Sequence, residues 1–374
     1  MFDINNRVVS LYLPQYHPIP ENDLWWGKGF TEWTNVVRAK PLYKRHYQPQ
    51  LPADLGFYDL RLNEVMVQQA ELARAHGIYG FCFYHYWFNG KRLLERPTNN
   101  LLDSGKPDFP FMYCWANENW TRRWDGDDQQ VLIKQEYCHE DDIRHIEHLI
   151  PVFKDHRYIR VDDKPVFIVY RPWLMPDIYE TVATWRRVAK EHGLDLYLCH
   201  MVFGYGNDWD KLLPCFDAAI DFEPFGIRHG KSTLFKDIKS MNVDFRMLSL
   251  VERFRKLFFN QYPERYKLNI KSYESIFSDY LPLNKIPFKM FPGLCPGWDN
   301  TPRRGNSPSL ILHGANPDKF EDWLAKIIED FTPYSKDENF IFINAWNEWA
   351  EGNHLEPCSK YGLDYLKAIK KMSS

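Results

Sequence analysis

The chain of 374 residues carries 47 basic and 50 acidic side chains, which gives a formal net charge of −3. This length accommodates one large α/β barrel or two average domains, and the near balance of charge argues against a nucleic-acid or anionic-membrane partner. Aromatic residues make up 17% of the chain. Many of them stand next to Asn, Glu, His or Asp in the sequence, a mixture that is typical of carbohydrate clefts.

The seven cysteines show no Cys-x-x-Cys or zinc-like spacing. Cys82, Cys114 and Cys199 lie in apolar runs and are predicted to be small buried hydrophobes, which favours a reducing compartment. The first residues lack the pattern of a signal peptide, and no apolar run is long enough for a membrane span. We therefore expect a cytoplasmic protein.

The 13 histidines are dispersed along the chain. One tight pair, His145 and His148, falls on a predicted helix, where we expect a solvated surface rather than a metal site. The sequence therefore predicts neither a metal nor a cofactor.

Short apolar runs alternate with amphipathic helical patterns along the whole chain. The runs are rich in Val, Ile, Phe, Tyr or Cys and end in polar or turn residues, as buried parallel strands do. The predicted strands are 8–16, 78–87, 111–115, 165–170, 196–202, 218–222, 290–295 and 340–346. The predicted helices are 63–76, 140–154, 177–192 and 318–331. Gly77 and Gly193 follow two of these helices, at a position where glycine commonly ends a helix.

Strict alternation of eight strands with helices predicts a single (β/α)8 TIM barrel over residues 1–374. The surplus residues follow strand ends, at 17–62, 117–138 and 225–289, the last being an insertion between the sixth and seventh strands. In a barrel these extended loops would build the active-site face. The alternative is a doubly wound sheet, which would carry a Gly-rich phosphate turn after an early strand, and the sequence has none.

The last predicted strand leads into two carboxylates, Glu348 and Glu351, which stand among tryptophans and are followed by Gly352. Positions three apart point to opposite faces of a strand but are neighbours in a helical turn. We therefore expect the strand to stop near Glu348 and turn, so that both carboxylates enter one pocket. Glycosidic bonds are usually cleaved between such a pair. The alternative is a capping or salt-bridge pair on the barrel rim.

Other polar and aromatic residues gather where the predicted strands end. Aromatic faces can pack against sugar rings, and amides or carboxylates can bind hydroxyl groups, whereas the competing interpretation of each residue is core packing or a solvated loop. Asp221, after the sixth strand, is a further candidate acid. The predicted substrate-binding residues are Tyr12, His17, Tyr84, His85, Trp87, Asn117, Glu118, Trp120, Glu223, Trp298, Asp299 and Asn347.

Several of these motifs together resemble the WbsX-type branch of the glycoside hydrolase family 99-like proteins, over nearly the whole chain. The motifs are Tyr-Leu-Pro-Gln-Tyr-His-Pro at 12–18, Trp-Trp-Gly-Lys-Gly-Phe-Thr-Glu-Trp-Thr-Asn-Val at 25–36, Gly-Phe-Cys-Phe-Tyr-His-Tyr-Trp-Phe at 80–88, Trp-Ala-Asn-Glu-Asn-Trp at 115–120 and Asn-Glu-Trp-Ala-Glu-Gly at 347–352. Family 99 enzymes carry Glu-Trp-His-Glu at the last motif, and Ala350 replaces the His here.

The resemblance implies a (β/α)8 barrel and a retaining, metal-independent hydrolysis of α-mannosides. It also implies roles for the two acids. Glu348 would act as a general base on the sugar 2-hydroxyl, which attacks C1 to give a 1,2-anhydro sugar. Glu351 would protonate the leaving oxygen and later activate water. Because O1 and O2 sit on adjacent carbons, their two partners must lie close together.

The leading functional hypothesis is a retaining glycoside hydrolase that acts on an α-mannose-like or related bacterial polysaccharide. The alternative is a glycosyltransferase of surface polysaccharide (O-antigen or capsule) biosynthesis, which the WbsX-type label and the absence of a signal peptide favour, and for which Asp125-Gly126-Asp127 could mimic an Asp-x-Asp motif. A third possibility is a non-catalytic glycan-binding barrel, which would not need both Glu348 and Glu351. In each case the expected partner is an oligo- or polysaccharide.

Overall fold

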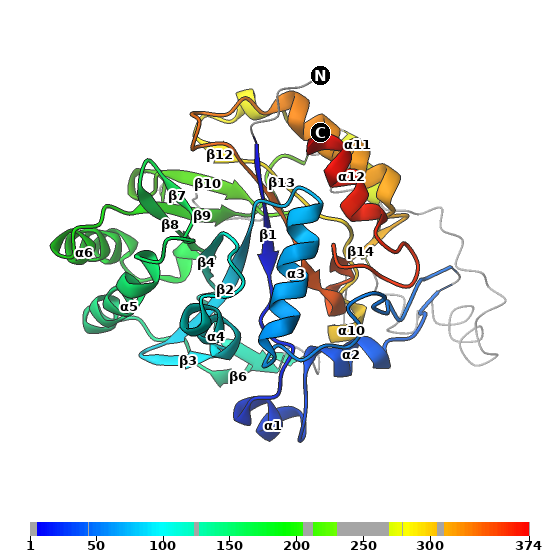
Figure 1. Ribbon diagram of the computed structural model, residues 1–374, viewed down its shortest axis with the longest axis horizontal. Coiled ribbons are helices and arrows are strands. Elements are labelled where there is room, and N and C mark those ends of the chain that lie inside the picture. Colours follow the sequence, from blue (N-terminus) through cyan, green and yellow to red (C-terminus); the bar gives the residue numbers. More distant parts are fainter. Residues whose placement is uncertain are drawn as a thin grey trace, which may run out of the picture.

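The computed structural model describes residues 6–43, 45–122, 127–204, 212–229, 269–278, 280–304 and 310–373. Within them, nine parallel strands form a nearly closed barrel in the order β12-β10-β9-β8-β4-β2-β1-β15-β13 (Figure 1). The barrel strands are β1 (Arg7–Tyr12), β2 (Gly80–Phe88), β4 (Phe111–Trp115), β8 (Lys164–Val169), β9 (Tyr197–Val202), β10 (Ala218–Asp221), β12 (Met290–Phe291), β13 (Gly293–Leu294) and β15 (Phe340–Ile343).

Two of these strands are pieces of one course through the barrel. Only Pro292 separates β12 from β13, and β12 pairs with β10 while β13 pairs with β15. Proline has no N–H to donate, but its carbonyl accepts a hydrogen bond from the Phe342 N–H at 2.9 Å. The first and last strands also pair, with Arg7 opposite Phe340. The predicted TIM-barrel fold is therefore confirmed, and the doubly wound sheet is excluded.

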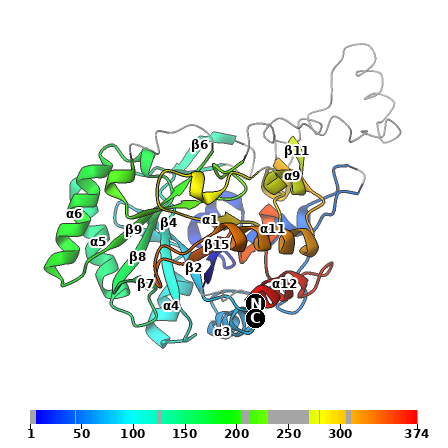
Figure 2. The ribbon, with the colours of Figure 1, turned by 90° about the horizontal axis from the view of Figure 1, so that it is seen from above.

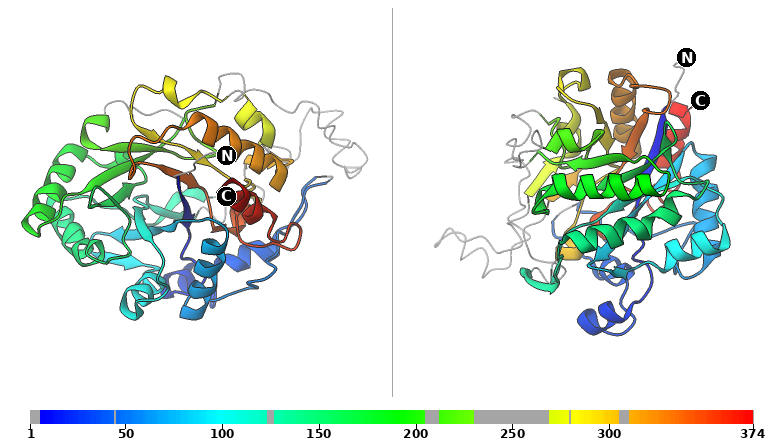
Figure 3. Two further views of the ribbon diagram at one scale, coloured as in Figure 1. Left: turned by 45° about the horizontal axis from the view of Figure 1, so that its top comes forward. Right: turned by 90° about the vertical axis from the view of Figure 1, so that its left-hand side faces the viewer.

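The strands are buried on both faces, as their apolar runs predicted, because helices cover the outside of the barrel (Figures 2 and 3). The four predicted helices are present with ends shifted by at most one residue, and Gly77 and Gly193 have positive φ angles of 84° and 78° just beyond two of them. The outer helices are α3 (Asn63–Ala75), α4 (Arg96–Ser104), α5 (His139–Phe153), α6 (Ile178–Glu191), α11 (Pro317–Asp330) and α12 (Asp364–Ser373).

Shorter elements follow the carboxyl ends of the strands. In Figure 1, β1 runs downward, and α1, α2, α10 and β6 lie at the lower end of the barrel. These loop elements are α1 (Pro20–Trp26), α2 (Glu32–Arg38), β3 (Lys91–Leu93), β5 (Trp120–Arg122), β6 (Asp127–Ile133) and α10 (Thr301–Arg304). The short strand β7 (Arg160–Val161) precedes β8 and forms an antiparallel hairpin with it.

Much of the predicted insertion at 225–289 lies outside the described residues. Its described part contains β11 (Asn269–Ser272) and α9 (Tyr273–Ser278). Strand β11 pairs in parallel with β14 (Leu310–His313), so this segment forms a small second sheet beside the barrel.

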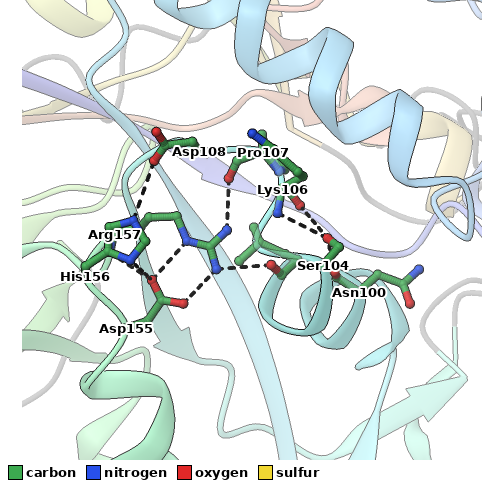
Figure 4. A network of polar contacts seen from close by, with 9 residues as sticks. Asn100, Ser104, Lys106, Pro107, Asp108, Asp155, His156 and Arg157 are labelled. Atoms are coloured by element: carbon green, nitrogen blue, oxygen red, sulfur yellow. Dashed lines mark hydrogen bonds and ion pairs between the residues drawn. The ribbon is translucent and has the colours of Figure 1, made fainter.

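The loop that enters β4 is held by a buried guanidinium (Figure 4). Arg157 donates to the carbonyl oxygens of Pro107 at 3.0 Å and Leu101 at 3.1 Å, and it pairs with Asp155 at 2.7 Å. Its side chain is only 2% exposed. The contacts join α4, the segment before β4 and the segment after α5.

We expect Arg157→Met to lower the free energy of unfolding by roughly 3–5 kcal/mol, because it leaves a partly buried carboxylate and two carbonyls without their cation. Urea unfolding would measure the loss. The matched control is Arg187→Met, since Arg187 pairs with Glu191 on the surface and its side chain is 53% exposed. The control should cost about 0–1 kcal/mol, and equal losses in both variants would contradict the prediction.

Candidate active site

The two carboxylates singled out in the sequence lie where the last barrel strand gives way to a turn. Strand β15 ends at Ile343, three residues earlier than predicted, and a short antiparallel pair follows, β16 (Asn347–Glu348) with β17 (Asn353–His354). Between them, residues Trp349–Glu351 form a single 3₁₀ turn, which Gly352 ends in the left-handed conformation with φ of 57°. The expected break in strand geometry between Glu348 and Glu351 is confirmed.

A single guanidinium joins both carboxylates. Arg303, in α10, places Nη2 at 2.6 Å from Glu348 and Nη1 at 2.7 Å from Glu351. Its Nε lies 2.5 Å from Glu32, the first residue of α2. Three carboxylates from distant parts of the chain therefore surround one cation, and the Glu348 and Glu351 side chains are held on neighbouring nitrogens of the same planar group.

This cluster is largely removed from water, and its charges do not balance. Burial raises the pKa of Glu348 to about 8, against the lowering influence of Arg303, while Glu351 and Glu32 raise it further. Burial also raises the pKa of Glu32, which Arg303 opposes. The three neighbouring carboxylates in turn hold the pKa of the Arg303 guanidinium well above its usual range, despite burial. Glu348 is thus a stronger base than an exposed carboxylate.

The raised pKa of Glu348 predicts a stability that depends on pH. Between pH of about 4.5 and 8 the unfolded chain releases this proton while the folded chain keeps it, so the charged form increasingly disfavours folding as pH rises. Glu348→Gln cannot ionise. We expect it to unfold like the natural chain near pH 4 and to be more stable by on the order of a few kcal/mol near pH 8.5.

Chemical denaturation at the two pH values would measure this difference. Glu274→Gln, at an exposed carboxylate in α9, is the control. A stability difference for Glu348→Gln that is the same at both pH values would contradict the prediction.

Glu348 and Glu351 line a cavity of about 430 Å³ at the carboxyl end of the barrel. Four of the predicted substrate-binding residues also line it, namely Tyr84, Glu118, Trp120 and Trp298. Glu118 is paired with Arg171 at 2.8 Å. The wall is completed mainly by aromatic and basic residues, including Trp26, Tyr86, Tyr170, Phe222, Phe225 and Arg304. Aromatic faces between charged groups suit a sugar ring and its hydroxyls.

Three predicted binding residues point to the outside of the barrel because side chains alternate along a strand. On β2, Tyr84 and Tyr86 face the cavity, whereas His85 and Trp87 pack against α5. There His85 lies 3.1 Å from His145, and Trp87 donates to Asp141 at 3.0 Å.

On β1, Tyr12 likewise faces outward, and it donates to Gln69 of α3 at 2.6 Å. Of the three binding residues predicted on β2, Tyr84 alone lines the cavity, together with Tyr86. His145 and His148 stack on Trp87, with ring centroids 4.8 and 5.2 Å away, and do not form the solvated surface that we expected.

Two predicted binding residues, Asn117 and Asn347, instead hold the loops that carry the cavity wall. Asn117 accepts from the Arg171 N–H at 2.7 Å and donates to the Arg171 carbonyl at 2.8 Å. Asn347 makes the same two-way contact with the backbone of Leu13, at 2.7 and 3.0 Å. Their amides are occupied by the backbone and do not reach the cavity.

Asp299 likewise holds a loop in place, on the far side of the 3₁₀ turn that carries Glu351. Its carboxylate accepts from His46 and Gln48, both at 2.6 Å, and from Thr301, and these partners hold its pKa low despite burial. Its backbone N–H donates to the Glu351 carbonyl at 2.6 Å. Asp299 therefore fixes the position of the Glu351 turn and has no oxygen directed into the main cavity.

The acids after the sixth strand form a separate buried cluster. Glu223 pairs with His229 at 2.8 Å, and the Glu223 carboxylate raises the pKa of His229 to about 9 against the effect of burial. Burial and the neighbouring Glu223 raise the pKa of Asp221 to about 7. His17 is also enclosed, and burial lowers its pKa to about 4. None of Asp221, Glu223 and His17 lines the main cavity.

Arg303, which joins the two candidate acids, is a member of the candidate site that the sequence did not predict. It stands in an Arg-Arg pair shortly after the predicted strand 290–295, at the end of the barrel where active-site residues gather, so its position carried a usable signal. Nothing in the sequence indicates that its side chain meets three carboxylates. The Asp125-Gly126-Asp127 triplet, by contrast, lies outside the described residues except for the backbone of its last member.

The arrangement of the cavity can be compared with known proteins. The family described as Glycosyltransferase WbsX matches residues 8–369 of this chain. The chain belongs to the WbsX family. A relative called uncharacterized protein WxcX, from Xanthomonas campestris pv. campestris (strain ATCC 33913), is 41% identical to this WbsX chain over 366 residues, and its counterpart in strain B100 is 40% identical. The chain spans about half the length of these relatives, 49% in each case.

Solved structures with the same fold include glycoside hydrolases. A glycoside hydrolase-like protein superimposes on the WbsX chain with a TM-score of 0.58 at 14% identity, covering 99% of this chain and 95% of that protein. The GH99 endo-α-mannosidase from Bacteroides thetaiotaomicron gives a TM-score of 0.51 at 13% identity, covering 98% and 96%. At such identities the likeness establishes the TIM-barrel fold.

The described residues contain neither a metal-binding cluster nor a membrane-spanning helix. No group of three or more His, Cys, Asp or Glu side chains there is arranged to hold a metal ion. Among the same residues, no helix is both long and apolar enough to cross a membrane.

Proposed function

We propose that this WbsX protein is a retaining glycoside hydrolase that acts on an α-mannose-like unit of a bacterial polysaccharide through a 1,2-anhydro sugar. The observation that carries the proposal is the pair Glu348 and Glu351 on neighbouring nitrogens of Arg303, at the base of an aromatic cavity. A base and an acid held this closely suit two oxygens on adjacent carbons of one sugar. The resemblance to family 99 implies which carboxylate is the base and which is the acid.

In the first step, Glu348 takes the proton of the 2-hydroxyl, and O2 attacks C1. The bond from C1 to the leaving oxygen breaks, and Glu351 gives that oxygen a proton. In the second step, Glu351 takes a proton from water, which attacks C1; the C1–O2 bond of the anhydro sugar breaks, and Glu348 returns its proton to O2. Two inversions at C1 restore the original anomer. The raised pKa of Glu348 supports its role, because a base works best with a pKa near the working pH.

A second candidate is transfer to a sugar hydroxyl in place of water, which the description of the family as Glycosyltransferase WbsX favours. The same two acids would serve, because an acceptor hydroxyl can replace water in the second step. Both candidates use a glycosidic donor. A third reading, a glycan-binding barrel without catalysis, leaves the raised pKa of Glu348 and its pairing with Glu351 without a use.

Product analysis by NMR separates these functions. The protein is incubated with α-mannose-containing bacterial polysaccharides, with and without an excess of acceptor oligosaccharide, and the first anomer released is recorded. We expect the α-anomer from hydrolysis in water. If an elongated acceptor is the sole product, the protein is a transglycosylase and not a hydrolase. Product formed only from a nucleotide sugar would overturn the proposal.

A further inference from the structure

A second cavity, of about 190 Å³, lies behind the turn that carries Glu351. Glu351 faces the main cavity while the next residue, Gly352, faces the second one, and Trp298 borders both. The wall between them is thin. A Cβ on Gly352 would come within 2.6 Å of Gln50, and a Cβ on Gly297 within 2.9 Å of the Gly352 carbonyl. Apart from Trp298, which lines both cavities, the proposed function uses no residue of this second cavity.

The lining of the second cavity is aromatic. Tyr43 stacks on His46 with ring centroids 4.5 Å apart and planes inclined by 6°. Tyr47, Tyr361 and Tyr365 lie on other sides. This is the kind of surface on which a sugar ring packs. The Tyr43 hydroxyl contacts His313 and the Tyr361 hydroxyl donates to the Ala315 carbonyl, so the hydroxyls of Tyr47 and Tyr365 are the ones left to contact a sugar.

The charge of the second cavity differs from that of the first. Asp299 is its single acidic lining residue among those described, and His46, Gln48 and Thr301 already occupy that carboxylate. Two lining cations, Arg45 and Lys360, are exposed at its rim.

Neither cation forms an ion pair within the described part of the chain; Lys360 instead lies over the rings of Tyr47 and Tyr361, at 4.6 and 4.4 Å. Burial lowers the pKa of His313, and His46, Lys319, Arg45 and Lys360 lower it further, which is the effect of a positive field. The second cavity therefore favours an anion.

We infer that the second cavity is a binding site for a negatively charged sugar unit, bearing a carboxylate or a phosphate, next to the unit that the main cavity processes. The identity of the ligand as part of a glycan rests on the proposed function. The ring would pack on the tyrosines, and the acidic group would meet Lys360 and Arg45. The site thus selects acidic polysaccharides over neutral ones.

Isothermal titration calorimetry tests the inference directly. The probes are methyl glucuronoside, its neutral counterpart methyl glucoside, glucose 6-phosphate and inorganic phosphate, titrated into a Glu351→Gln background in which turnover is strongly slowed. We expect the charged sugars to bind at least about tenfold more tightly than the neutral one, as charge-assisted hydrogen bonds require. The preferred charged sugar shows whether carboxylate or phosphate is the natural group.

Lys360→Met and, separately, Arg45→Met should each weaken binding of the charged sugar about tenfold and leave the neutral sugar unaffected. Lys367→Met, at an exposed lysine in α12, is the control. Equal affinity for charged and neutral sugars, or phosphate alone binding as tightly as the acidic sugar, would overturn the inference.

Turnover provides an independent readout. If the protein is a glycosidase, Lys360→Met should raise KM for an acidic polysaccharide without lowering kcat, and should leave KM for a neutral one unchanged. A uniform change in KM for both would count against the site. If the natural chain shows no turnover of any glycan, the proposed function is refuted but the binding site is not, because the calorimetric result does not depend on catalysis.

Discussion

Replacing Glu351 by Gln should lower kcat on a glycan substrate by about 10²–10⁴-fold, the usual contribution of a positioned general acid. Glutamine keeps the size of the side chain and can still accept from Arg303, but it has no proton to give to the leaving oxygen. The protein should remain folded, since the change removes one of three carboxylates around a single cation. Initial rates on the polysaccharide, with circular dichroism as a check on folding, measure this effect.

The leaving group provides a sharper test of the same role. An α-mannosyl fluoride needs no protonation to depart. In the first turnover, before Glu351 is needed to activate water, Glu351→Gln should therefore impair release of fluoride far less than release of a sugar leaving group. Glu118→Gln, in the wall of the same cavity, should raise KM and change kcat little. If Glu351→Gln slows both leaving groups equally, Glu351 is not the acid.

Removing Arg303 should displace the pH dependence of the reaction towards alkaline pH. Arg303 lowers the pKa of Glu348, whereas burial, Glu351 and Glu32 raise it to about 8. In Arg303→Met the remaining influences all favour the protonated form. The acid limb of kcat/KM, which reports ionisation of the free base, should therefore move from about pH 8 to a higher pH. Activity at pH 7 should fall accordingly.

A double variant isolates the electrostatic cause. Glu32→Gln removes a carboxylate that raises the pKa of Glu348. The double variant Arg303→Met with Glu32→Gln should therefore reverse part of the alkaline shift in the acid limb of kcat/KM. Arg304→Met, the neighbouring residue in the same cavity, should leave the limb in place. A pH profile that stays unchanged in Arg303→Met would show that the guanidinium does not tune the base.

The barrel was predictable because its strands carry a strong signal. A strand buried on both faces must be apolar throughout, as Phe111–Trp115 is, so its limits can be read from polarity alone. The last strand was predicted too long because Ala345 and Trp346 are as apolar and buried as the strand itself, although the chain has already left β geometry there.

The site was predictable in part, and the limits have physical causes. The turn between Glu348 and Glu351 followed from the alternation of side chains along a strand. The same alternation, applied to residues 84–87, would also have separated the inward-facing Tyr84 and Tyr86 from the outward-facing His85 and Trp87. The alternation of side chains could not reveal whether the Asn117 amide binds a ligand or the protein backbone, because the same amide group serves both uses. The meeting of Arg303 with Glu32 depends on how two long loops fold over the barrel, which sequence spacing does not encode.

The pairing of β1 with β15 and of β15 with β13 makes this edge of the barrel the seam at which the chain closes on itself. Glu32 follows β1, Arg303 follows β13, and Glu348 follows β15. The charged cluster therefore sits across the seam, and it joins residues that are far apart along the chain. Closing so large a loop is entropically costly and depends on contacts across the rest of the barrel. A partly folded chain with an open seam would still have the turn that carries Glu348 and Glu351, but not the Arg303 guanidinium that holds both carboxylates, so full catalysis would report that folding is complete.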